Sequence, residues 1–175
     1  MKKITAIILA MLCVFALCAC GGGETNKPEE TAAQSEYVAD YGELYFESNG
    51  VKFGIFDEAE PVINALGEPV NGTFESDSCA YQGKDYFYYY DGFELMANEL
   101  DGVKKITGIT LADDTVKIPQ GVTVGMKLDD ALALMGDGYT QNGDVYKFVT
   151  GTTQLRLRVG EDGTLAAVEY SAANA

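Results

Sequence analysis

The sequence contains no histidine, and arginine occurs only at Arg156 and Arg158. Serine and cysteine nucleophiles usually need a positioned base, most often a histidine. The sequence also lacks a Gly-x-Ser-x-Gly motif and a phosphate-binding glycine loop. We therefore expect no catalytic residues and a protein that is not an enzyme.

Cysteine is scarce in the part of the chain that we expect to fold. The four cysteines are Cys13, Cys18, Cys20 and Cys79, and only Cys79 lies outside the N-terminal region. A single thiol excludes an intramolecular disulfide, and structural zinc needs four Cys or His ligands. We expect no metal and no cofactor, and we expect Cys79 to be an inert thiol buried in a short strand, 79–82.

Basic residues are outnumbered, with 12 Lys and Arg against 27 Asp and Glu, so that the net charge is −15. Nucleic-acid binding depends on clustered Lys and Arg side chains. The charge therefore excludes nucleic acid as a partner, whereas it permits cationic partners.

Long apolar segments are also absent, apart from a 14-residue stretch, Ile4–Leu17, that follows Lys2 and Lys3. A membrane-spanning helix needs about 20 apolar residues. A short apolar run behind two lysines is typical of a cleaved signal peptide. We assign residues 1–19 to this signal.

The residues Leu17-Cys18-Ala19-Cys20 resemble a bacterial lipobox, in which cleavage precedes the cysteine and a lipid is attached to its thiol. An ordinary secretory signal with a nearby cysteine is the alternative. The resemblance implies lipidation of Cys20 and a location on the extracytoplasmic face of the cell membrane, held through this lipid. Loss of Lys2 and Lys3 would take the net charge from −15 to −17.

Residues 20–36 contain no aromatic and no β-branched apolar side chain. Such a segment cannot bury enough apolar surface to offset its ordering entropy. We expect a lipid-anchored, disordered stalk.

The remaining chain shows a repeated order of signals. Asn49-Gly50 predicts a hairpin between strands 43–48 and 51–56. A helix follows over 59–66, with Asp57 and Glu60 as a capping box and Gly67 as its end. Further strands are expected at 85–90, 93–99 and 103–111, and the second part of the chain offers a helix at 128–135 and strands at 145–149, 153–159 and 165–170.

We therefore expect an α+β fold of two tandem repeats, each a helix plus an antiparallel sheet, that share one core. The hairpin and first repeat occupy 37–112, a connector 113–121, and the second repeat 122–175.

The repeated units of an apolar residue, a glycine, a helix and a hairpin resemble the tandem-repeat fold of β-lactamase-inhibitor-like proteins and of small outer-membrane-assembly lipoproteins. The stretch Ser78-Cys79-Ala80-Tyr81-Gln82-Gly83 is similar to uncharacterised lipoproteins of anaerobic Gram-positive bacteria. The resemblance implies binding and not catalysis.

Alternation along the strands divides the side chains between two faces. Tyr88, Leu95 and Leu157 share the expected core face. The opposite face carries the candidate binding residues and is expected to present Asn98 and Gln154 as well. The candidate binding residues are Phe87, Tyr89, Met96, Lys147, Arg156 and Arg158.

Aromatic residues, Met and Arg are enriched at protein interfaces, although a solvated face would show the same pattern. We expect a non-catalytic module that binds a protein or a cell-wall component. A small envelope hydrolase or a solute-binding lipoprotein is the alternative.

Overall fold

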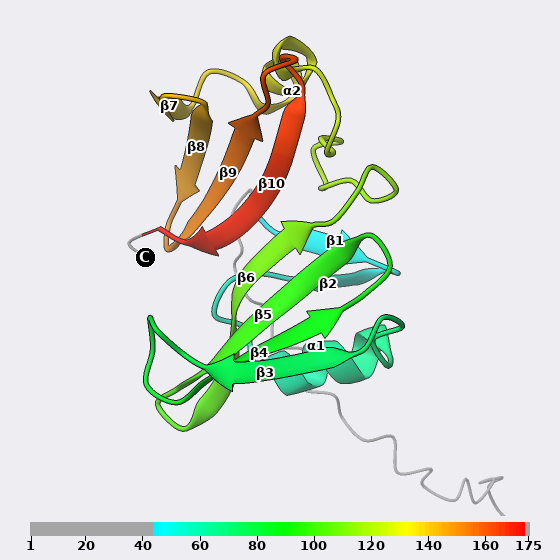
Figure 1. Ribbon diagram of the computed structural model, residues 1–175, viewed down its shortest axis with the longest axis vertical. Coiled ribbons are helices and arrows are strands. Elements are labelled where there is room, and N and C mark those ends of the chain that lie inside the picture. Colours follow the sequence, from blue (N-terminus) through cyan, green and yellow to red (C-terminus); the bar gives the residue numbers. More distant parts are fainter. Residues whose placement is uncertain (1–43, 174–175) are drawn as a thin grey trace, which may run out of the picture. The chain divides into compact units, whose positions relative to one another are not determined.

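The computed structural model describes residues 44–173, and the expected signal peptide, lipidation site and stalk lie outside this range. The described chain forms one eight-stranded antiparallel sheet, one two-stranded hairpin and two short helices (Figure 1). The strands of the large sheet follow the order β3-β4-β5-β6-β10-β9-β8-β7. The elements are β1 (Phe46–Ser48), β2 (Val51–Phe53), α1 (Ala59–Leu66), β3 (Thr73–Asp77), β4 (Lys84–Tyr89), β5 (Phe93–Leu100), β6 (Val103–Leu111), α2 (Leu128–Met135), β7 (Tyr139–Asn142), β8 (Val145–Thr150), β9 (Thr153–Val159) and β10 (Leu165–Ala172).

The hairpin turns follow the local sequence. Asn49 and Gly50 both have positive φ angles, of 53° and 79°, and Phe46 pairs with Phe53 across them. Asp101 and Gly102 repeat this geometry between β5 and β6. Asn and Gly tolerate the left-handed backbone that such two-residue turns require. The hairpin predicted at Asn49-Gly50 is confirmed.

The hydrophobic core lies on one face of the sheet and under the β1–β2 hairpin. Phe46 and Phe53 are fully buried, and the Phe46 ring lies 4.9 Å from that of Phe93 on β5. In Figure 1 the hairpin, in cyan, lies behind β5 and β6. The expected core side chains Leu95 and Leu157 are also fully buried.

Each helix is held on this face through the residue that precedes it. Glu58 forms an isolated β-bridge to Lys105 of β6, and Lys127 forms one to Thr164 just before β10. Both are the N-cap residues of their helices, and neither uses its side chain as a cap. The capping box is therefore wrong: the Asp57 carboxylate instead accepts a hydrogen bond of 2.8 Å from the Gly54 amide.

The α+β prediction of two helix-plus-sheet repeats is also wrong. Among the described residues, strand accounts for 48% and helix for only 12%, and eight of the ten strands form a single antiparallel sheet. Each helix has eight residues, which span about 12 Å. Helices of this length cannot form a layer over eight strands. The rest of the cover comes from the hairpin and from the connecting segment after β6, whose Ile118 and Val122 are buried.

Two strands were missing from the prediction. Both β3 and β7 lie at the ends of the sheet. Their sequences, Thr-Phe-Glu-Ser-Asp and Tyr-Thr-Gln-Asn, are mostly polar and lack the alternation of a half-buried strand.

The strand expected at 79–82 is absent, and Cys79 is exposed in the loop between β3 and β4. Ser78 Oγ accepts hydrogen bonds from the amides of Ala80 and Tyr81, at 3.2 and 3.0 Å. This side-chain-to-backbone turn competes with strand pairing. The prediction of a buried Cys79 is therefore wrong.

Candidate functional site

The candidate binding residues lie on the face of the large sheet opposite the hydrophobic core, which we call the helix-free face. Both described helices and the β1–β2 hairpin pack on the core side. Strand register places two rows of side chains across the helix-free face. One row is Phe74, Phe87, Met96, Gly108, Ser171, Gln154 and Val149, and the other is Tyr89, Glu94, Thr110, Glu169, Arg156, Lys147 and Thr140.

The structure therefore brings the predicted residues onto one face, but it does not bring them into one patch. Met96 lies on β5 and Arg156 on β9, three strand spacings apart. Adjacent strands are about 4.8 Å apart, which gives a separation of about 14 Å along the sheet. The face has an aromatic end on β3–β5 and a basic end on β8 and β9.

The aromatic end includes a residue that the sequence analysis missed. Phe74 on β3 stands opposite Phe87, with ring centroids 6.1 Å apart, and it is 57% exposed. Met96 lies over Gly108, where a Cβ atom would come within 3.4 Å of its Cβ and Cε atoms. The polar neighbours of Phe74 lack the alternation that would indicate a half-buried strand.

At the basic end, Lys147 stands directly opposite Arg156. The Arg156 guanidinium lies 3.4 Å from the Glu169 carboxylate. Within residues 44–173, neither Lys147 nor Arg158 has a carboxylate within ion-pair distance. Because only one of the three cations has a carboxylate partner within the described range, this end presents a local positive charge on a strongly acidic protein. The placement of two like charges directly opposite one another is itself unfavourable in a sheet.

Glu94 lies on β5, at the inner border of the aromatic end, opposite Tyr89 and Thr110. Partial burial raises the pKa of its carboxyl group, because desolvation disfavours the charged form. A partner that covers this face would desolvate Glu94 further.

Two side chains assigned to this face are buried and not presented. Asn98 is fully buried, accepts a hydrogen bond from the Thr107 hydroxyl and donates one of 3.1 Å to the Lys84 carbonyl. Gln154 is 5% exposed, and its Nε2 donates to Ser171 Oγ at 2.9 Å. The expectation that both are presented to solvent is wrong. Strand register keeps Gln154 on the helix-free face, where it is buried beside Ser171 and its Oε1 has no hydrogen-bond partner among the described residues.

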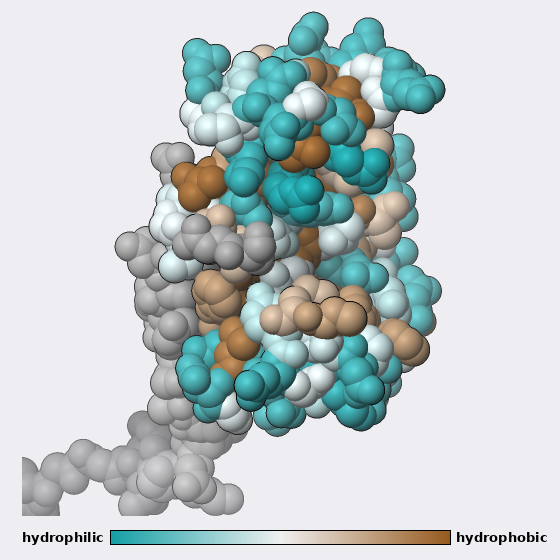
Figure 2. All heavy atoms as spheres, turned by 60° about the vertical axis from the view of Figure 1, so that its left-hand side comes forward, coloured by the Kyte–Doolittle hydropathy of each residue, from teal (hydrophilic) through white to brown (hydrophobic). Residues whose placement is uncertain are grey.

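Exposed apolar side chains are otherwise scattered. In Figure 2 the brown, apolar residues form separate patches among teal, hydrophilic ones. Isolated apolar side chains are normal on protein surfaces, and the pairing of Phe74 with Phe87 distinguishes the aromatic end from them. The large apolar residues exposed in the described range are Val70, Phe74, Val103, Leu134 and Val149.

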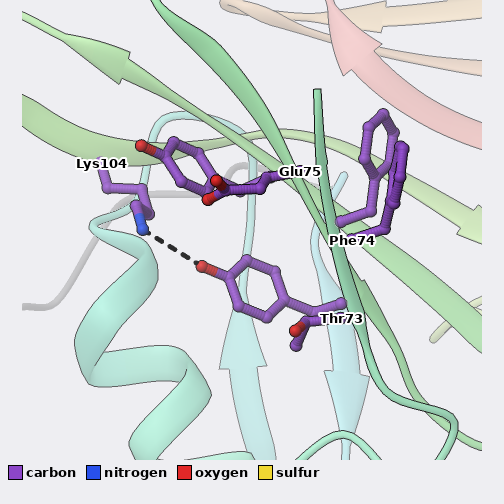
Figure 3. A pocket seen from close by; sticks show the side chains of 7 residues that line it. Thr73, Phe74, Glu75 and Lys104 are labelled. Atoms are coloured by element: carbon purple, nitrogen blue, oxygen red, sulfur yellow. Dashed lines mark hydrogen bonds between the residues drawn. The ribbon is translucent and has the colours of Figure 1, made fainter. Parts of the chain in front are cut away.

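A shallow groove of about 320 Å³ lies along strand β3 (Figure 3). Lys104 reaches across β5 into this region: its Nζ lies 3.6 Å from the centre of the Tyr86 ring and donates a hydrogen bond of 3.4 Å to the Tyr88 hydroxyl. The Tyr86 hydroxyl donates to Glu99 Oε1 at 3.1 Å. The groove therefore combines aromatic rings with charged groups. It is lined by Thr73, Phe74, Glu75, Tyr86, Phe87, Tyr88 and Lys104.

No family model, curated protein or solved structure matches this chain. The described residues contain no group of three or more His, Cys, Asp or Glu side chains arranged to hold a metal ion. Within the same range, neither helix has the length and apolar character needed to span a bilayer.

Proposed function

We propose that this protein is a lipid-anchored, extracytoplasmic binding module whose helix-free face contacts a partner protein. The observation that carries the proposal is the row of Phe74, Phe87 and Met96. These large side chains adjoin one another on a face that the described helices leave uncovered. Aromatic and Met side chains supply much of the energy of protein interfaces.

The two ends of the face suggest a division of roles. The aromatic end offers apolar area for burial. Lys147, Arg156 and Arg158 give orientation, since rim charges affect specificity and association rate more than affinity.

The test separates binding from stability. The double variant Tyr89→Ala, Arg156→Ala changes half-buried side chains on the helix-free face. Surface substitutions usually change stability by within about 0.5 kcal/mol. We expect its thermal midpoint to stay close to that of the wild type, while capture of the partner from envelope extracts falls severalfold. Quantitative mass spectrometry on immobilised wild type and variant measures the capture.

Two control variants complete the design. Leu157→Ala empties a fully buried core position and should cost about 2–5 kcal/mol of stability. Val103→Ala truncates an exposed apolar residue outside the candidate rows and should leave both properties unchanged. Equal capture by the double variant and the wild type would contradict the proposal.

A further inference from the structure

Strand β3 ends the large sheet, and its five residues pair only with β4 among the described strands. The opposite end, β7, has four residues and carries no charged side chain. By contrast, β3 carries Glu75 and Asp77. The two edges therefore offer different surfaces to an incoming strand.

The hydrogen-bond pattern shows which backbone groups of β3 point away from β4. Tyr89 N donates to Gly72 O, and Ser78 N donates to Gly83 O, both at 3.0 Å. In an antiparallel pair, alternate residues exchange both bonds with their partners. The even-numbered residues of β3 therefore face β4, and the amides and carbonyls of Thr73, Glu75 and Asp77 face outward.

The side chains of β3 alternate between the two faces of the sheet. Figure 3 shows Glu75 and Lys104 on one side of β3 and Phe74 on the other. Glu75 pairs with Lys84, whose hydrogen bond and charge lower the pKa of the Glu75 carboxyl. The edge thus presents carboxylates on one side and an exposed aromatic ring on the other.

We propose that an extended, basic segment of a partner protein adds to β3 as a further antiparallel strand. Its backbone would bond the outward groups of Thr73, Glu75 and Asp77, as in other cases of strand addition. Lys or Arg residues opposite Glu75 and Asp77 would form cross-strand charge pairs. An aromatic residue opposite Phe74 would lie on the other side. The inference rests on the proposed function, in that the partner is a protein.

Charge favours this occupant over a second copy of the chain. An antiparallel β3–β3 pair centred on Glu75 would place two identical carboxylates opposite each other, which is destabilising. The net charge of −15 attracts a basic segment and repels another copy.

The probe is the acetylated, amidated peptide Thr-Lys-Thr-Lys-Phe-Thr-Thr, which sets its two Lys residues opposite Asp77 and Glu75. With the full chain in detergent, saturating peptide should slow amide hydrogen exchange at Thr73, Glu75 and Asp77 by at least about tenfold, since these amides become hydrogen-bonded. The same peptide N-methylated at both Lys residues keeps its side chains but loses the amide donors that face Glu75 and Asp77. It should give no protection.

Two variants test the side-chain part of the proposal. Loss of a charge pair or of an aromatic pair corresponds to about fivefold in affinity, so Asp77→Lys and Phe74→Ala should each weaken the peptide by about that factor. Val149→Ala, at an equally exposed apolar position on β8, should bind as the wild type does.

Each contrary result is specific. Equal binding of the N-methylated peptide, or binding without protection of the three amides, would overturn strand addition. Protection that rises with protein concentration in the absence of peptide would show that a second copy occupies the edge. If Tyr89→Ala with Arg156→Ala loses its partner while the β3 amides stay unprotected, the proposed function stands and the edge inference fails.

Discussion

The Cys79 thiol lies on the surface, in the loop between β3 and β4. An accessible thiol reacts through its thiolate without prior unfolding. We expect a thiol reagent to label Cys79 in the native protein within about threefold of its rate in urea, as followed by absorbance. Cys79→Ser provides the blank. A native rate more than about a hundredfold slower would show that the loop is closed over the thiol.

The prediction of a buried Cys79 failed for a reason that lies in one neighbouring side chain. Free cysteine is among the residues most often buried, and Cys79-Ala80-Tyr81 looks like a short apolar strand. The Ser78 hydroxyl, however, turns the backbone by accepting two amide hydrogen bonds. The apolar character of Cys79 and its neighbours would have indicated a buried strand only if the backbone had stayed extended there.

Among the described glycines, Gly92 in the turn between β4 and β5 has the least space for a side chain. A Cβ atom on Gly92 would lie 2.1 Å from Val116 Cγ2 and 2.5 Å from Thr115 Oγ1, so that the following connector packs directly on this turn. Gly102 has the same φ angle of 78° but nothing within 4 Å. Substituting Gly102 therefore adds backbone strain alone, whereas substituting Gly92 adds the same strain and a steric clash.

We expect Gly102→Ala to cost about 1–2 kcal/mol, which is the penalty for a left-handed alanine. Gly92→Ala should cost about 1–3 kcal/mol more, because overpacking adds to that strain. Urea denaturation of both variants measures the difference. Equal losses would mean that the connector moves away from the turn without cost.

The elements that sequence predicted well are those whose cause is local. Asn49-Gly50 specifies a hairpin through its own backbone preferences, and alternation placed Leu95 and Leu157 in the core. The edge strand with Phe74 was not predictable in this way, because its pairing with β4 depends on a partner strand and not on its own pattern.

For the whole molecule, the proposed lipid on Cys20 determines where the domain acts. Two acyl chains hold a protein firmly at a membrane. We expect Cys20→Ser to leave the membrane fraction or to retain its signal peptide. Detergent phase partitioning and the mass of the product measure both outcomes, with Cys79→Ser as the matched cysteine control. A cleaved Cys20→Ser protein that still partitions into detergent would contradict the lipobox assignment.

The separation of the candidate site into an aromatic end and a basic end is a property of the whole sheet. Parity along single strands placed Met96 and Arg156 on the same face correctly. Their separation could not be read from the strands, because it depends on β6 pairing with β10 across Ile109 and Tyr170. That long-range pairing also joins the strands into one sheet.

The Tyr170 hydroxyl donates a hydrogen bond of 3.0 Å to the Tyr45 carbonyl, 125 positions earlier in the chain. The Tyr170 ring also packs 6.3 Å from the Phe46 ring. Contacts so distant in sequence form late, since the chain between them must first be ordered. The packing of the β1–β2 hairpin in the core is therefore complete only when β10 is in place. Without β10 the aromatic core around Phe46 lacks the Tyr170 ring that packs against it.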